Sequence, residues 1–216
     1  MQHLDIVTIV IIAANVIISM KGFNDFHFFE KYKFNIAGIK RGEQLRMVTS
    51  GFLHADFNHL LFNMLTLYFF APVVVGYLGV TYFVLIYIGA LIAGSLLSFQ
   101  FHKDEPYYSA IGASGAVTGI LYAAILLNPS MSLYLYFIPI PIPAWFVGVA
   151  YLLYSIYGMR AKKDNIGHDA HFGGAIAGYV LTLVFAPYIL SNSLWIVVLL
   201  AIPIILLFVL KKLDKI

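Results

Sequence analysis

Four polar side chains interrupt the long apolar stretches of this sequence, and their types suit hydrolytic chemistry. They are Ser114, His171, His59 and Asn63. The serine lies in the string Gly-Ala-Ser-Gly, and His171 lies in Ala-His-Phe-Gly-Gly. A strongly polar or ionisable side chain inside an apolar membrane segment is energetically costly, so each of the four is a candidate functional residue.

A serine beside a histidine is equipped for acyl transfer. The serine hydroxyl is a weak nucleophile until a neighbouring base takes its proton, and an imidazole titrates near neutral pH. We predict Ser114 as the nucleophile and His171 as general base and then general acid. The oxyanion donors available are the Asn63 amide, His59 and the backbone N–H of Ser114. We expect Asp169 to point elsewhere on its helix, which makes the site a dyad.

Other histidines and aromatics near these strings receive structural interpretations. We expect His54 to stabilise a loop at the membrane boundary, and His168, one turn before the candidate base, to be solvated. The aromatics Trp145, Phe146 and Tyr151 are expected to pack or to face lipid, with the lining of a lateral substrate gate as the alternative.

The composition requires a membrane. Of the 216 residues 62% are hydrophobic and 11% charged, and the mean hydropathy is +0.90, against an apolar content of roughly 45–50% in soluble domains. The absence of cysteine excludes disulfides and thiolate metal sites. The 13 Lys and Arg cluster outside the apolar runs, which favours loops at a lipid headgroup surface and gives no indication of nucleic-acid binding.

The apolar runs predict an all-α, polytopic helical bundle. A bilayer core needs about 20 apolar residues per helix, and backbone groups in lipid must bond internally. We predict one domain over 1–216, with a six-helix core to about residue 190 and a seventh helix after it. The first run lacks a basic segment before it and a cleavage site after it, so it is expected to be a retained span. The predicted spans are 4–20, 55–76, 80–101, 111–128, 134–158, 169–189 and 194–210.

Two segments between these spans are expected to be irregular. The stretch 21–53 mixes aromatic and basic residues, which predicts a folded loop lying in the membrane interface. The alternating Ile and Pro of 138–143 cannot continue a helix, so the fifth helix is expected to begin properly near Ala144.

The direction of the helices would bring the four candidate residues together. Consecutive spans alternate in direction, so the second, fourth and sixth begin on the same side of the membrane. The candidates all lie in the first two turns or so of these spans, which places them at similar shallow depth. Gly115 and Gly119 in the fourth span, and Gly174 and Gly178 in the sixth, form small-residue stripes that allow close backbone contact. Packing along these stripes would carry the histidine towards the serine.

These residues make the chain resemble the rhomboid family of intramembrane serine proteases over nearly its whole length. Three motifs occur in the family's order on the second, fourth and sixth spans. They are Arg46 followed by 52–54 and by His59-x-x-x-Asn63, the nucleophile string at 112–115, and the base string at 170–178.

The resemblance implies Ser114 as nucleophile, His171 as base, and His59, Asn63 and the Ser114 N–H as oxyanion stabilisers. It implies cleavage of single-span membrane proteins at or near the membrane surface, without metal or cofactor, in a multi-pass protein of the bacterial inner membrane. The sequence departs from the family at Thr118, where an aromatic residue often supports the histidine ring.

Two alternatives and one conflict follow from the same residues. A catalytically silent rhomboid-like binder is the first alternative. A transporter or channel that uses the two histidines is the second, although two histidines without a carboxylate or thiolate make a poor metal site. With seven spans all 13 basic residues fall on the side of the candidate site, which the positive-inside rule assigns to the cytoplasm. The family resemblance implies the opposite orientation.

Overall fold

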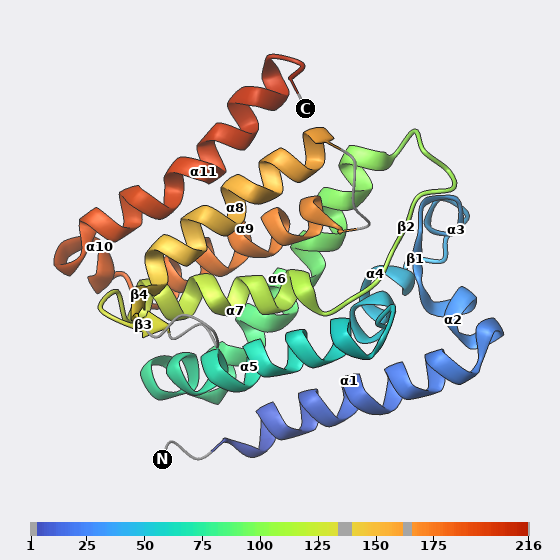
Figure 1. Ribbon diagram of the computed structural model, residues 1–216, viewed down its shortest axis with the longest axis horizontal. Coiled ribbons are helices and arrows are strands. Elements are labelled where there is room, and N and C mark those ends of the chain that lie inside the picture. The colour runs from blue at the N-terminus through green and yellow to red at the C-terminus, as the bar shows by residue number, and fades with distance from the viewer. Residues whose placement is uncertain (1–3, 134–139, 162–165, 216) are drawn as a thin grey trace.

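The computed structural model describes residues 4–133, 140–161 and 166–215 as a bundle of helices with two short antiparallel strand pairs (Figure 1). Seven of the helices are long and follow the predicted spans in order. They are α1 (Ile6–Asn24), α5 (Phe57–Leu78), α6 (Val80–His102), α7 (Ser114–Leu127), α8 (Ala144–Ala161), α9 (His168–Phe185) and α11 (Leu194–Lys212).

The shorter elements lie in the connections. The first long loop holds α2 (Phe26–Tyr32), β1 (Phe34–Asn35), α3 (Ile36–Lys40), α4 (Arg46–Thr49) and the 3-10 helix η1 (Ser50–Phe52). The remaining ones are β2 (Ser109–Ala110), β3 (Ser132–Leu133), β4 (Ile142–Pro143) and α10 (Tyr188–Asn192). Strand β1 pairs antiparallel with β2, and β3 with β4. The first loop is therefore folded, as predicted, and is tied to the segment that leads into α7.

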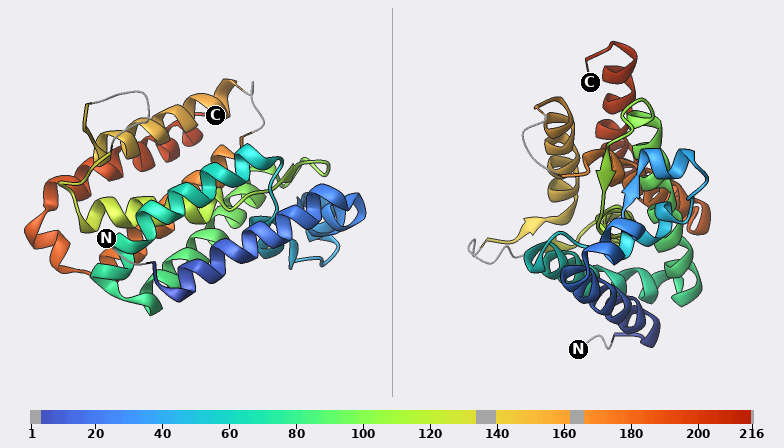
Figure 2. Two further views of the ribbon diagram at one scale, coloured as in Figure 1. Left: turned by 60° about the horizontal axis from the view of Figure 1, so that its bottom comes forward. Right: turned by 90° about the vertical axis from the view of Figure 1, so that its right-hand side faces the viewer.

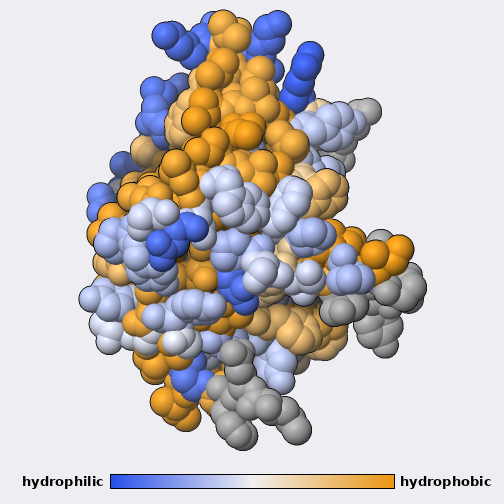
Figure 3. Space-filling model, turned by 90° about the vertical axis from the view of Figure 1, so that its left-hand side faces the viewer, coloured by the Kyte–Doolittle hydropathy of each residue, from blue (hydrophilic) through white to orange (hydrophobic). Residues whose placement is uncertain are grey.

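Within the part of the chain that the structure describes, four helices, α1, α5, α6 and α11, are long and apolar enough to cross a membrane. Their outer faces carry exposed large apolar side chains, and the upper part of Figure 3, over α11, is mainly hydrophobic. Exposed side chains of this kind along several helices are suited to lipid contact. The chain is a helical membrane bundle.

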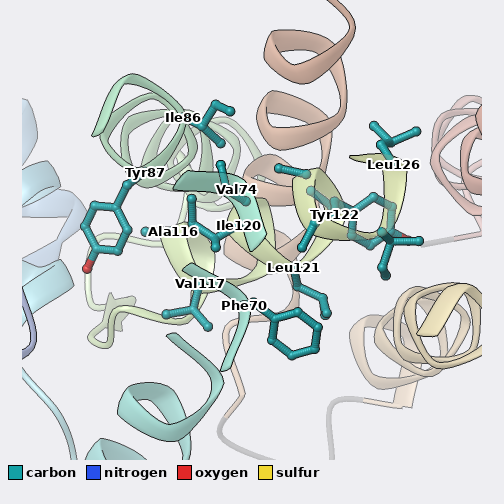
Figure 4. Close-up of a cluster of buried hydrophobic side chains, with 14 of the residues drawn as sticks. Phe70, Val74, Ile86, Tyr87, Ala116, Val117, Ile120, Leu121, Tyr122 and Leu126 are labelled. Atoms are coloured by element: carbon teal, nitrogen blue, oxygen red, sulfur yellow. The ribbon is translucent and has the colours of Figure 1, made fainter. Parts of the chain in front are cut away.

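Helix α7 is shorter than its neighbours and lies at the centre of the bundle (Figures 1 and 2). Every residue from Gly115 to Leu127 is buried. Its side chains contact those of α5 and α6 in the main hydrophobic cluster, where Val74, Ile86 and Ile120 meet (Figure 4). A helix enclosed by protein on all sides needs no lipid-facing surface, which explains its continuous apolar sequence.

The ends of the helices have local causes. The Asp56 side chain accepts a hydrogen bond of 2.8 Å from the His59 N–H and caps α5, as aspartate does well at an N-cap. Gly79 alone joins α5 to α6, with φ at +83°, a conformation that favours glycine.

The predicted sixth span extends beyond the end of its helix. Helix α9 ends at Phe185 and not at 189, because Pro187 disfavours helical backbone at Ala186 before it, and α10 follows as a separate short helix. The fifth helix begins at Ala144, as the proline pattern predicts. Residues 134–139 of the predicted fifth span lie outside the described residues.

Candidate active site

Ser114 and His171, from helices far apart in the sequence, meet near one end of the bundle. Ser114 is the first residue of α7, and His171 lies in the first turn of α9. The His171 Nε2 and the Ser114 Oγ are 2.8 Å apart, within hydrogen-bonding distance. The imidazole is 4% exposed, and the serine is partly exposed. The structure therefore brings together the two residues predicted as base and nucleophile.

Glycine packing between α7 and α9 sets this contact. A Cβ atom added at Gly174 would lie 1.9 Å from the Gly115 carbonyl oxygen, and one added at Gly178 would lie 2.2 Å from the Gly119 carbonyl oxygen. The two backbones are thus in direct contact along the stripes predicted from the sequence. A backbone contact of this kind has no side-chain rotamers to adjust, so it fixes the distance between the ends that carry the dyad.

The second ring nitrogen of His171 contacts a residue that the sequence analysis interprets differently. The Tyr151 hydroxyl oxygen on α8 lies 2.8 Å from the His171 Nδ1, and the two ring centroids are 5.4 Å apart. Tyr151 therefore packs against another side chain, which is one of the two expectations, and its hydroxyl contact with the candidate base is a feature that the sequence did not predict. One signal for it was present in the sequence: Thr118 occupies the place of the family's aromatic support and leaves room for a ring from another helix.

Asp169 does not orient the base, which agrees with the expectation that it points elsewhere on its helix. Its carboxylate lies on the side of α9 that faces α6, where the Tyr108 hydroxyl donates to Oδ1 at 3.3 Å and the His102 Nε2 lies 3.7 Å from Oδ2. The rings of His102 and Tyr108 stack with centroids 3.6 Å apart. Burial, together with the Asp169 carboxylate, raises the pKa of Tyr108. This cluster ties α9 to the loop before α7.

His59 lies beside the loop that leads into Ser114. The Ala55 N–H donates to its Nδ1 at 3.4 Å, which leaves the proton of the neutral ring on Nε2. Gly112 has φ at +119°, and a Cβ atom there would lie 2.8 Å from the His59 Nε2 and 3.7 Å from the Ser114 Oγ. The donor nitrogen of His59 and the nucleophile therefore border the same small space above Gly112.

Asn63 is buried one turn further along α5, 6% exposed. Its Nδ2 donates to the His59 carbonyl oxygen at 2.9 Å. An amide nitrogen carries two N–H groups, so one hydrogen-bond donor remains on the same face of α5 as His59.

His54 holds the nucleophile loop through a buried chain of hydrogen bonds. The Ala113 N–H donates to His54 Nε2 at 3.4 Å, and the His54 Nδ1 lies 2.8 Å from the Ser19 Oγ. Ser19 donates in turn to the Phe52 carbonyl oxygen at 2.9 Å. Burial, and to a smaller extent the nearby His59, lowers the pKa of His54 to about 3, so the ring is neutral. His54 is thus placed to stabilise the loop, as expected.

His168 differs from its prediction. The sequence analysis expects a solvated side chain, but the residue is 3% exposed. A Cβ atom at Gly158 of α8 would lie 2.0 Å from the His168 Nε2, so α8 covers the ring at a glycine. The His168 ring is perpendicular to the His171 ring, and the two ring centroids are 6.1 Å apart. Of the remaining aromatics, Trp145 packs against Trp195 of α11.

A small cavity of about 30 Å³ opens beside the serine, a size that holds a single water molecule. The residues that line it include Ser95, Ser98 and Ser114. Among the described residues, no group of three or more His, Cys, Asp or Glu side chains is placed to hold a metal ion.

The comparisons with known proteins identify the family of this chain. A family model described as Rhomboid domain matches residues 41–188, and the chain belongs to the rhomboid family. It is 29% identical to RHOMBOID-like protein 12, mitochondrial, of Arabidopsis thaliana over 182 residues, which are 77% of this chain and 54% of that protein. It is 36% identical to Rhomboid protease GluP of Bacillus subtilis over 146 residues, which are 65% of this chain and 26% of that protein.

A third relative is mitochondrial. Rhomboid protein 1, mitochondrial, of Saccharomyces cerevisiae is 31% identical over 138 residues, which are 62% of this chain and 40% of that protein. The chain spans about half or less of the length of these three relatives. The protein is a multi-pass membrane protein, but its relatives include mitochondrial ones and do not support the expected bacterial inner membrane.

Proposed function

We propose that this protein is an intramembrane serine endopeptidase that cleaves single-span membrane proteins with Ser114 as nucleophile and His171 as base. The observation that carries the proposal is the 2.8 Å contact between the His171 Nε2 and the Ser114 Oγ. A relative named as a rhomboid protease, 36% identical over 146 residues, supports the same class of reaction.

In the first step the Ser114 oxygen attacks the scissile carbonyl carbon while its proton passes to the His171 Nε2. The negative charge that develops on the carbonyl oxygen needs donors on the same side. The Ser114 N–H at the start of α7, the His59 Nε2–H and the free N–H of Asn63 are the donors we assign. The first of these also benefits from the partial positive charge at a helix N-terminus.

In the second step the peptide bond breaks as His171 returns the proton to the leaving amine, and an acyl group remains on Ser114. A water molecule then attacks the acyl carbon while its proton passes to His171, and His171 returns that proton to the Ser114 oxygen as the bond between Ser114 and the acyl group breaks and the acid product leaves. The cavity beside the serine has room for that water. The partial exposure of Ser114 near the helix ends provides a route from the aqueous side.

The substrate class follows from the position of the pair. Both residues lie near the ends of helices in a membrane bundle, so a scissile bond must reach them at the membrane boundary. A single-span segment that unwinds at one end would present such a bond.

A cleavage assay with a purified single-span model substrate tests this function. Ser114→Ala and His171→Ala are each expected to lose essentially all turnover, roughly 10³-fold or more, while keeping the thermal unfolding midpoint of the wild type in detergent. Ser130→Ala, at an exposed serine beyond the other end of α7, serves as the matched control and keeps full activity. Turnover unchanged in Ser114→Ala would overturn the proposal. A folded wild type that cuts no substrate would support a silent binder in its place.

A further inference from the structure

We propose that Tyr151 is a positioning residue for the general base, with its hydroxyl held against the His171 Nδ1 while the His171 Nε2 faces Ser114. The inference rests on the proposed function of the Ser114 and His171 pair. It assigns the orienting role that a carboxylate fulfils in Ser-His-Asp triads to a neutral hydroxyl on α8.

The tautomer of His171 decides what Tyr151 can do. If Nε2 accepts the proton of Ser114, the neutral imidazole must carry its own proton on Nδ1. The atom placed to receive that proton is the Tyr151 oxygen at 2.8 Å, which has lone pairs to accept the bond. By accepting it, Tyr151 stabilises the tautomer that leaves Nε2 free to act as a base.

The hydroxyl of Thr118 is used on its own helix. It donates to the Ser114 carbonyl oxygen at 2.7 Å, so its proton is committed to the backbone of α7. The hydroxyl at the second ring nitrogen of His171 therefore comes from Tyr151 on α8.

Thr118 explains why the support comes from α8. The residue lies one turn after the nucleophile and is 3% exposed. A large aromatic side chain at this position would fill the space beside the imidazole from α7 itself. The short threonine leaves that space to the Tyr151 ring, which lies at 31° to the imidazole plane.

Contacts of α8 with its neighbours hold Tyr151 in register. The Tyr122 hydroxyl of α7 donates to the Gly148 carbonyl oxygen at 2.9 Å, one turn before Tyr151. Two turns after it, the close contact of Gly158 with His168 joins α8 to α9. The tyrosine is thus fixed between two contacts, each made at a glycine, and a small rotation of α8 would move its hydroxyl away from the base.

The decisive variant is Tyr151→Phe, which keeps the ring and removes the hydroxyl. The loss of one neutral hydrogen bond to the base is expected to lower kcat roughly ten-fold, with KM within about two-fold of the wild type and an unchanged thermal midpoint. The matched control is Tyr157→Phe, on the same helix at a side chain that is 61% exposed; it should behave as the wild type in all three measurements. A kcat equal to that of the wild type in Tyr151→Phe overturns the proposal, as does an equal fall of kcat in Tyr157→Phe.

A second control separates the contact at His171 from the loss of a nearby hydroxyl. Thr118→Val keeps the shape of the side chain and removes a hydroxyl that bonds to the Ser114 carbonyl oxygen. Because that hydroxyl does not orient the imidazole, Thr118→Val should lower kcat much less than Tyr151→Phe does. An equal fall of kcat in the two variants would contradict a specific role of Tyr151. The outcome is distinct from a failure of the proposed function, because that failure would leave the wild type itself inactive and insensitive to Ser114→Ala.

Discussion

The two halves of the candidate site are held in different ways. Helices α7 and α9 carry Ser114 and His171 and touch backbone to backbone at paired glycines. Helix α5 carries His59 and Asn63. Asp56 caps its first turn, and the His59 ring lies against Gly112, which has a positive φ and no side chain. The helices that carry the dyad are therefore set by backbone packing, whereas the position of the His59 donor depends on a helix cap and on one loop glycine. Substitutions at the contact between α7 and α9 and substitutions beside His59 should therefore differ in their effects on stability and turnover.

The largest effect is expected from Gly174→Ala at the α7 and α9 contact. The added methyl group would overlap the Gly115 carbonyl oxygen, and backbone has no rotamer with which to move away, so the helices must separate. We expect a loss of stability of about 3 kcal/mol or more and loss of turnover, measured by denaturant titration in detergent and by substrate cleavage.

Gly76→Ala is the control for this substitution. A Cβ atom at this α5 position meets nothing within 4 Å, so the exchange should be neutral or stabilising by about 0.5–1 kcal/mol. Equal stabilities of Gly174→Ala and Gly76→Ala would show that the dyad does not depend on the glycine contact.

The next effect should follow from Gly112→Ala at the donor side. The methyl group would overlap the His59 ring, and the residue must keep a positive φ. Displacing one oxyanion donor is expected to lower kcat roughly 100-fold. Gly42→Ala shares the backbone strain, with φ at +98°, but meets no atom within 4 Å. A similar loss of stability in both variants with a loss of kcat only in Gly112→Ala would place the effect at His59. Similar losses of kcat in both variants would show that backbone strain at the glycine, and not the contact with His59, causes the loss.

The smallest effect concerns the pH dependence of the nucleophile loop. Burial lowers the pKa of His54 to about 3, below its value in an unfolded chain, so the unfolded state binds the proton first as pH falls. The stability that depends on neutral His54 is complete above about pH 6.5 and is lost below it, at up to about 1.4 kcal/mol per pH unit.

His54→Gln should be less stable than the wild type at neutral pH and should show a shallower fall in unfolding free energy between about pH 6.5 and pH 5. His27→Gln, outside the site, should keep the wild-type slope. Identical slopes in the wild type and His54→Gln would contradict a buried, neutral His54.

The sequence predicts the helices and the pairing of the two catalytic candidates because both depend on local patterns. The length of the apolar runs identifies the spans. The glycine stripes and the first-turn positions of Ser114 and His171 indicate how deep these two residues lie in the membrane. Relations between helices that share no such pattern were not predictable. The inward rotation of α8, which brings Tyr151 to His171 and covers His168, depends on where two single glycines meet their neighbours. The end of α9 depends on a proline, Pro187, inside a predicted span.

The most direct test of the account is to identify the residue that a fluorophosphonate modifies, by mass spectrometry of the purified protein in detergent. Activation by the His171 imidazole should give a single adduct on Ser114, absent in His171→Ala and unaffected in Ser130→Ala. An adduct on another residue, or equal labelling of Ser114 without His171, would contradict the central claim that these two side chains act as one nucleophilic pair.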